Sequence, residues 1–129
     1  MNRDAITQAA QRISRYVRRT PVTSIERGEA RIILKLESMQ RSGSFKTRGA
    51  FNSMLSRPVP GAGVMAASGG NHGAAVAYAA HRLGVKAEIV VPTTTPQVKV
   101  ARLREYAAAV IVTGSDYADA LDASLELAR

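Results

Sequence analysis

Apolar residues along this chain follow two spacings, one typical of helices and one typical of buried strands. Over residues 4–17 they recur every three or four positions, which predicts an amphipathic helix with arginines on its other faces. Short, mostly apolar runs follow at 31–37, 64–67, 87–91 and 110–113, and each has the length of one strand. We therefore expect four strands after an amino-terminal helix.

Helical patterns separate the predicted strands. One helix begins near Lys46, and residues 71–83 are apolar on nearly every face, as expected for a helix buried against a sheet. Two more are predicted, one capped by Thr95 and running to about residue 106, and one capped by Ser115 and running to residue 127. Because strand and helix alternate with short connections, we predict an α/β fold, an open parallel sheet with helices on both faces.

The composition is that of a globular protein of 129 residues, with 46% hydrophobic and 22% charged side chains. The sequence contains no apolar run long enough for a membrane helix and no secretory pattern at its start, so we expect a cytoplasmic protein without membrane contact. It contains no cysteine, which excludes disulfides, thiolate metal sites and a cysteine nucleophile. We expect no metal.

The net charge of +8 lies entirely in the amino-terminal half. Residues 1–57 carry 12 Lys/Arg against 4 Asp/Glu, whereas residues 58–129 carry equal numbers of both. Basic patches favour nucleic acids, but only 5% of residues are aromatic and no tryptophan offers a stacking platform. A basic nucleic-acid-binding α/β module therefore stays an alternative. The other interpretation is that the basic half of the chain faces an acidic surface, or binds phosphate and carboxylate groups in a site of its own.

Lys46 is the first candidate for chemistry, because a glycine and two hydroxyls precede it in Ser42-Gly43-Ser44-Phe45. We predict that Ser44 caps the following helix, which places Lys46 in the first turn near the positive end of the helix dipole. Arg48 adds positive potential there. These surroundings disfavour the ammonium form and favour a neutral, nucleophilic amine, as carbonyl chemistry requires.

The second candidate is the turn Ser68-Gly69-Gly70-Asn71-His72-Gly73, which lies between a predicted strand and a predicted helix. Ligands of open parallel sheets collect at such strand ends, where the first amides of a helix favour an anion. The glycines allow close approach to the backbone, and Ser68 and Asn71 offer side-chain hydrogen bonds. A plain glycine-rich turn with an asparagine cap would look similar, but the pairing with Lys46 favours an anion site here.

The lysine segment and this turn together resemble the signature of the serine/threonine dehydratase family of pyridoxal-phosphate enzymes. Further matching segments lie in the same order along almost the whole chain: Arg19-Thr20-Pro21, residues 32–37, Ile89-Val90-Val91-Pro92 with Pro96 and Lys99, and Gly114 with Asp116-Tyr117. The resemblance implies the tryptophan-synthase-β-like fold, fold type II of these enzymes. It also implies pyridoxal phosphate as cofactor and, in the full-length form, a homo-oligomer.

The resemblance implies a role for each matched position. Lys46 is similar to the lysine that binds the cofactor covalently and moves the substrate's α-proton, and Phe45 to the residue packed beside the cofactor ring. Asn71 is similar to the asparagine that hydrogen-bonds the 3′ hydroxyl of the ring. The substrate carboxylate would be held by Ser68, Gly70, Asn71 and His72. His81 has no counterpart, and we expect it to be structural.

The implied reaction is the β-elimination of L-threonine or L-serine, an amino-acid substrate, to a 2-oxo acid and ammonia. Racemases of the family look similar but carry a serine at the position of Gly69, where it serves as an acid/base group on the opposite face of the cofactor. Gly69 cannot do this, so we expect elimination without efficient racemisation. Family members usually carry glycine at the position of Ala107, so a shifted turn is expected there.

The resemblance also sets expectations about organisation. Residues 1–30 would form a helix and lead-in that dock on a larger domain, and residues 31–129 the α/β domain that binds cofactor and substrate. The family's phosphate-binding loop and its partner for the pyridine nitrogen have no match in this sequence. We therefore expect the 129 residues alone to hold the cofactor weakly and to lack turnover. A non-catalytic fragment with the same fold is the main alternative.

Overall fold

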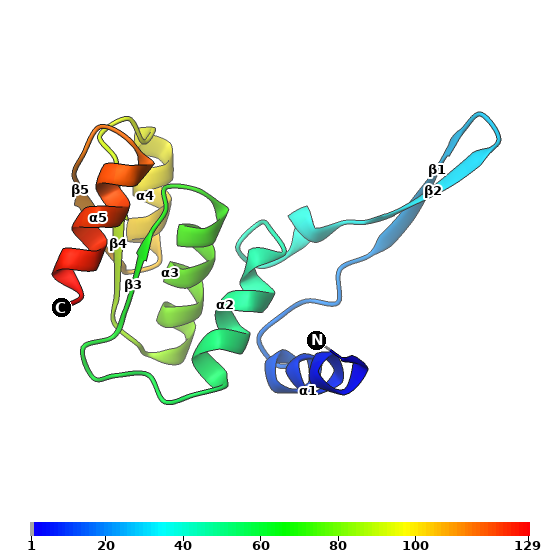
Figure 1. Ribbon diagram of the computed structural model, residues 1–129. Coiled ribbons are helices and arrows are strands. Elements are labelled where there is room, and N and C mark those ends of the chain that lie inside the picture. Colours follow the sequence, from blue (N-terminus) through cyan, green and yellow to red (C-terminus); the bar gives the residue numbers. More distant parts are fainter. Residues whose placement is uncertain (1) are drawn as a thin grey trace.

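The computed structural model describes residues 2–129, which form a three-stranded parallel sheet with flanking helices and a separate two-stranded hairpin (Figure 1). In chain order the elements are α1 (Arg3–Ile13), β1 (Val22–Arg27), β2 (Ala30–Lys35), the short 3-10 helix η1 (Glu37–Met39), α2 (Lys46–Leu55), β3 (Val64–Ala67), α3 (Asn71–Leu83), β4 (Ala87–Val91), α4 (Gln97–Glu105), β5 (Ala109–Val112) and α5 (Tyr117–Leu127). Within this part of the chain, every helix is too short or too polar to cross a lipid bilayer.

The parallel sheet has the strand order β3-β4-β5 and confirms the predicted α/β architecture. In the register of the central strand, Val90 pairs with Ala67 on one side and with Ile111 on the other. Ile89 and Val90 point to opposite faces of the sheet, and both are completely buried. Helices α3 and α5 contact the same two strands, β3 and β4, which is possible only from opposite faces of the sheet.

Residues 31–37 were expected to begin the parallel sheet, and this prediction is wrong. Residues 30–35 form β2, which pairs antiparallel with β1 in a hairpin that projects away from the rest of the molecule (Figure 1). Its turn contains Gly28 with a positive φ of 61°, which suits a tight hairpin. The polar–apolar alternation from Arg31 belongs to a solvated antiparallel ribbon. The predicted boundary after residue 30 falls inside this hairpin.

The core continues outward from the sheet through the helices α3, α2 and α1. Phe51 of α2 is completely buried, with its ring stacked on that of Tyr16 at 4.9 Å and edge-on to that of Tyr78 on α3 at 6.0 Å, measured between centroids. Ile13, the last residue of α1, is buried in the same cluster. Helix α1 packs against α2. It ends at Ile13, four residues before the predicted end at residue 17.

Helix ends agree with the predictions at some positions and differ at others. Gly84 ends α3 in the left-handed conformation, with φ 68°, as expected. The last helix is capped by Asp116, not by Ser115, because the Asp116 carboxylate accepts the amide hydrogen of Asp119 at 3.1 Å. The Asp119 carboxylate in turn accepts from the amide and hydroxyl of Ser115, the residue before the cap.

Ala107 follows α4 and is the one non-glycine residue with a positive φ, 56°, among residues 2–129. Its amide donates to the carbonyl of Arg104, and the amide of Ala108 donates to that of Leu103, so the turn closes the end of the helix. Such a turn suits glycine, because an alanine Cβ is strained there. With alanine at this position the turn is left-handed, and the shift expected relative to glycine-containing relatives stays a prediction.

Ala107→Gly is expected to raise the free energy of unfolding by about 1 kcal/mol. Glycine relieves the strain at the Cβ in the folded state, and this gain exceeds the entropic stabilisation that glycine gives the unfolded chain. Ala101→Gly, in the exposed middle of α4, is the control and should lower stability by about the same amount. Urea denaturation measures both. A loss of stability in Ala107→Gly equal to that of the control would show that the turn carries no strain.

Candidate active site

The carboxyl ends of β3, β4 and β5 lie at one edge of the sheet, and the loops that follow them meet there. Two of these loops are joined by hydrogen bonds. The amide and hydroxyl of Thr93 both donate to the carbonyl of Gly114 at 2.9 Å, and the hydroxyl of Thr94 donates to that of Ser115 at 3.4 Å. The turn after β3, with Ser68 at its start, lies beside this joined pair.

Lys46 is the first residue of α2 and is exposed. Its ammonium lies 5.2 Å from the ring centroid of Phe45, which is itself 58% exposed. Lys46 lines a cleft of about 400 Å³ that runs between α2 and α3 and is also lined by His72. The structure therefore brings these two predicted site residues to one cleft. Phe45 does not line this cleft, but its ring keeps a cation–π contact with Lys46.

The predicted cap of α2 is wrong, because Ser44 makes no capping hydrogen bond. The helix begins after Phe45 without a side-chain cap, and the Ser44 hydroxyl is buried without a partner among the described residues. Thr47 fixes the loop instead. Its buried hydroxyl is hydrogen-bonded to that of Ser42 and lies 3.0 Å from the carbonyl of Ser44. The loop before Lys46 is thus held by hydrogen bonds from Thr47, the second residue of α2.

The charge of Arg48 is paired, contrary to its expected role beside Lys46. Its guanidinium donates to both carboxylate oxygens of Glu37, at 2.7 and 2.9 Å, and Thr20 donates to the same carboxylate at 2.6 Å. These bonds, those from Arg48 above all, lower the pKa of Glu37 from 4.5 to about 2 and raise the pKa of Arg48. The pair connects the first turn of α2 to Glu37, which follows the second strand of the hairpin.

The Glu37–Arg48 pair predicts a pH dependence of stability. Because the pKa of Glu37 is lower in the folded state, its contribution is complete above about pH 4.5 and is lost as the pH falls toward 2. We expect the free energy of unfolding to fall by about 2 kcal/mol over that range, a value reduced for the partial exposure of both side chains. Glu37→Gln should lack this component in urea titrations at several pH values. An identical pH profile in both proteins would contradict it.

The turn after β3 leads directly into α3, whose first residue is Asn71 and whose amino-terminal cap is Gly70. Gly70 offers no side chain, so no side chain of the described residues caps the first amides of α3. The Ser68 hydroxyl stays local and accepts the amide hydrogen of Gly70 at 3.3 Å. An uncapped helix start with this dipole favours an anion, and the anion site expected from the sequence stays a prediction.

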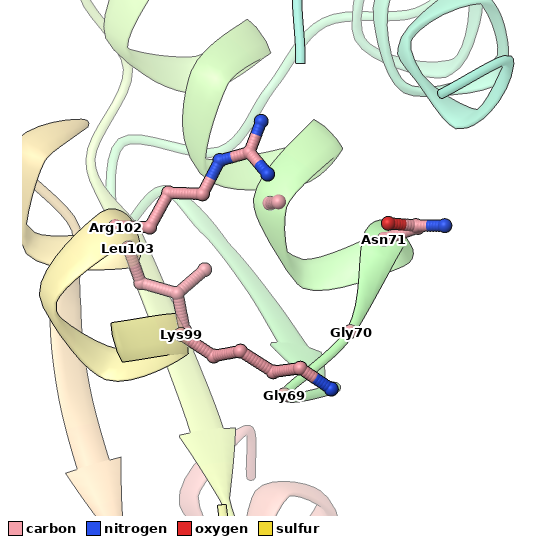
Figure 2. A pocket seen from close by; sticks show the side chains of 7 residues that line it. Gly69, Gly70, Asn71, Lys99, Arg102 and Leu103 are labelled. Carbon is pink, nitrogen blue, oxygen red and sulfur yellow. The ribbon is translucent and has the colours of Figure 1, made fainter. Parts of the chain in front are cut away.

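Two smaller hollows lie on the other side of this turn. Gly70 and Asn71 line one of about 220 Å³, together with Lys99 and Arg102 of α4. Figure 2 shows the Lys99 side chain extending toward Gly69, while the carboxamide of Asn71 points away from α4. Gly70 also lines a second hollow, with Ser68.

The predicted site residues therefore surround the amino end of α3, but they do not share one cavity. Lys46 and His72 face the cleft on one side, and Ser68 and Gly70 line a hollow on the other. The sequence did not single out Arg102, which reaches across from α4 and donates to the carbonyl of Ser42 at 2.8 Å. No local sequence signal marks this contact, because the two residues are far apart in the chain.

Comparison with known proteins extends over nearly the whole chain. The sequence profile of the family described as "Pyridoxal-phosphate dependent enzyme" matches residues 13–129. An L-threo-3-hydroxyaspartate ammonia-lyase from a Pseudomonas species is 43% identical over 113 residues, which are 82% of this chain and 35% of that protein. The catabolic L-threonine dehydratase of Escherichia coli K12 is 38% identical over 124 residues, 92% of this chain and 38% of that protein.

Solved structures show the same architecture. Maize serine racemase superposes with a TM-score of 0.86 and is 36% identical, over 96% of this chain and 40% of that chain. The chain thus spans between 35% and 40% of the length of these three relatives. Their names include ammonia-lyase, dehydratase and racemase, so several reactions occur among proteins similar to this chain.

Proposed function

The chain belongs to the family of pyridoxal-phosphate dependent enzymes, and from this premise we propose that its residues serve the conversion of L-threonine or L-serine to a 2-oxo acid and ammonia. Membership confirms the resemblance seen in the sequence and the cofactor it implies, and the superposition confirms the tryptophan-synthase-β-like fold. One observation carries the reaction type. The exposed side chain of Lys46 lines a cleft, while Gly69 offers no acid/base group on the turn after β3.

The residues present fit the part of pyridoxal phosphate that reacts. Lys46 offers an exposed primary amine to an aldehyde, and the exposed carboxamide of Asn71 would bond the ring hydroxyl. The exposed ring of Phe45 offers an apolar surface beside the amine. When bound, the cofactor supplies an electron sink for negative charge that develops at the substrate's Cα.

The chain's own residues then bind the substrate and move its proton. The uncapped amides at the start of α3 favour the substrate carboxylate, and Ser68, Gly70, Asn71 and His72 are the residues proposed to hold it. Lys46 in its neutral form would accept the α-proton at Nζ, on the side of the cleft. This proposal uses one base and needs no second acid/base group at Cα.

The reaction type is tested by incubating the full natural polypeptide that contains residues 1–129 with pyridoxal phosphate and L-serine. We expect pyruvate to form at least about ten times faster than D-serine, because only Lys46 moves the α-proton. Chiral chromatography follows D-serine, and a coupled dehydrogenase assay follows pyruvate, with 2-oxobutanoate from L-threonine measured in parallel. Faster formation of D-serine than of pyruvate would overturn the proposal.

A further inference from the structure

Gly69 lies in the turn between β3 and α3, yet its backbone does not require glycine. It is not among the glycines with a positive φ, so an L side chain is conformationally acceptable there. The obstacle is Thr95, in the loop after the neighbouring strand β4. A Cβ on residue 69 would lie 2.8 Å from both Cγ2 and Oγ1 of Thr95, and 3.5 Å from its Cβ.

Thr95 is held in this position. Only 9% of its surface is exposed, and its amide donates to the carbonyl of Pro92 at 3.0 Å, which closes the turn after β4. Pro96 follows with its ring-fixed φ of −56° and caps α4. The loop is tied further to the end of β5 through Thr93. The backbone of Thr95 therefore has little room to retreat from residue 69.

Rotation of the Thr95 side chain does not remove the obstacle. A β-branched residue carries two heavy γ atoms, which fill two of the three staggered positions about χ1. Both filled positions now face residue 69. Any other staggered rotamer leaves one γ atom in one of these positions, so the contact at residue 69 persists. Serine has one γ atom and can turn it away, and alanine has none.

We propose that Thr95 is a specificity-determining residue, which keeps position 69 without a side chain and so restricts the site to the single base Lys46. The inference rests on the proposed function, in which Lys46 removes the α-proton. Inversion at Cα needs a second group. That group gives a proton to the opposite face of Cα, while Lys46 keeps the proton that it removed. The second group then regains a proton from water. A serine at position 69 is the group that Thr95 excludes.

The contact is tested first without cofactor or substrate, by the thermal stability of the full natural polypeptide containing residues 1–129. Gly69→Ala is made in four backgrounds, which are the wild type with Thr95 and the variants Thr95→Val, Thr95→Ser and Thr95→Ala. We expect Gly69→Ala to lower Tm by about 5 °C or more when residue 95 is threonine or valine, and by less than about 2 °C when it is serine or alanine. Gly61→Ala, with open space around its new Cβ, controls for adding a methyl group.

The specificity claim is tested with Gly69→Ser in the Thr95→Ala and Thr95→Val backgrounds, loaded with pyridoxal phosphate. The ratio of D-serine to pyruvate formed from L-serine is expected to be at least about tenfold higher with alanine than with valine. Equal ratios would overturn the specificity role, and equal losses of Tm in all four backgrounds would overturn the contact. A wild-type enzyme that forms no pyruvate would overturn the proposed function. The Tm series needs no turnover, so it tests the Thr95 contact independently of that result.

Discussion

Lys46→Ala is expected to lower the rate of 2-oxo-acid formation from L-threonine by about 1,000-fold or more. The side chain is exposed on a cleft at the first residue of α2, where it is proposed to bind the cofactor and accept the α-proton. Removing it leaves the start of α2 without either function. The rate is measured as 2-oxobutanoate from saturating L-threonine with excess pyridoxal phosphate.

Two further variants separate the amine from its charge. Lys46→Arg keeps the positive charge but offers no amine for an aldehyde, and should lose as much activity as Lys46→Ala. Lys86→Ala removes an exposed lysine from the segment between α3 and β4, and should keep the wild-type rate. Activity of Lys46→Arg near the wild-type rate would contradict covalent use of Lys46 and leave it only an electrostatic role.

Gly73→Ala is expected to lower the free energy of unfolding by about 3 kcal/mol. Gly73 lies in the first turn of α3, where the helix passes directly over the turn that follows β3. An added Cβ would overlap the carbonyl oxygen of Ser68 and lie 3.2 Å from Cγ2 of Ile89 in β4. Both neighbours are part of the sheet or its turn, so the helix must move outward.

Gly70→Ala is the matched control, because its Cβ would meet only the Ser68 hydroxyl, at 4.0 Å. Its φ of −110° also permits alanine, and we expect a change of less than about 1 kcal/mol in urea denaturation. Similar losses in both variants would contradict the close packing of α3 on the turn. A large loss in Gly73→Ala alone would support it.

The elements around the sheet were predictable because their sequences are strongly periodic. The bounds of β3, α3 and β4 agree residue for residue with those expected from apolar runs and from Gly84. The hairpin was not predicted, because the pairing of β1 with β2 depends on partners along the chain and not on periodicity. A strand's apolar run does not specify which sheet it joins.

The places of the candidate site residues in the fold were predictable, and their contacts were less so. The sequence placed Lys46 at the start of a helix and Asn71 after a strand, and the structure agrees with both. The pairing of Arg48 with Glu37 was hidden, because it depends on how the end of the hairpin turns toward α2. The approach of Thr95 to Gly69 likewise arises only when β3 and β4 lie side by side.

The central claim is that Lys46 is the residue that binds pyridoxal phosphate, and reductive labelling tests it most directly. The full natural polypeptide containing residues 1–129 is loaded with the cofactor, reduced with borohydride and digested with trypsin. Because a modified lysine resists cleavage, mass spectrometry should find the pyridoxyl group on one peptide that spans residues 42–48. The same treatment of Lys46→Ala should give no such label. Label on Lys35, Lys86 or Lys99 instead, or label that survives in Lys46→Ala, would contradict the claim.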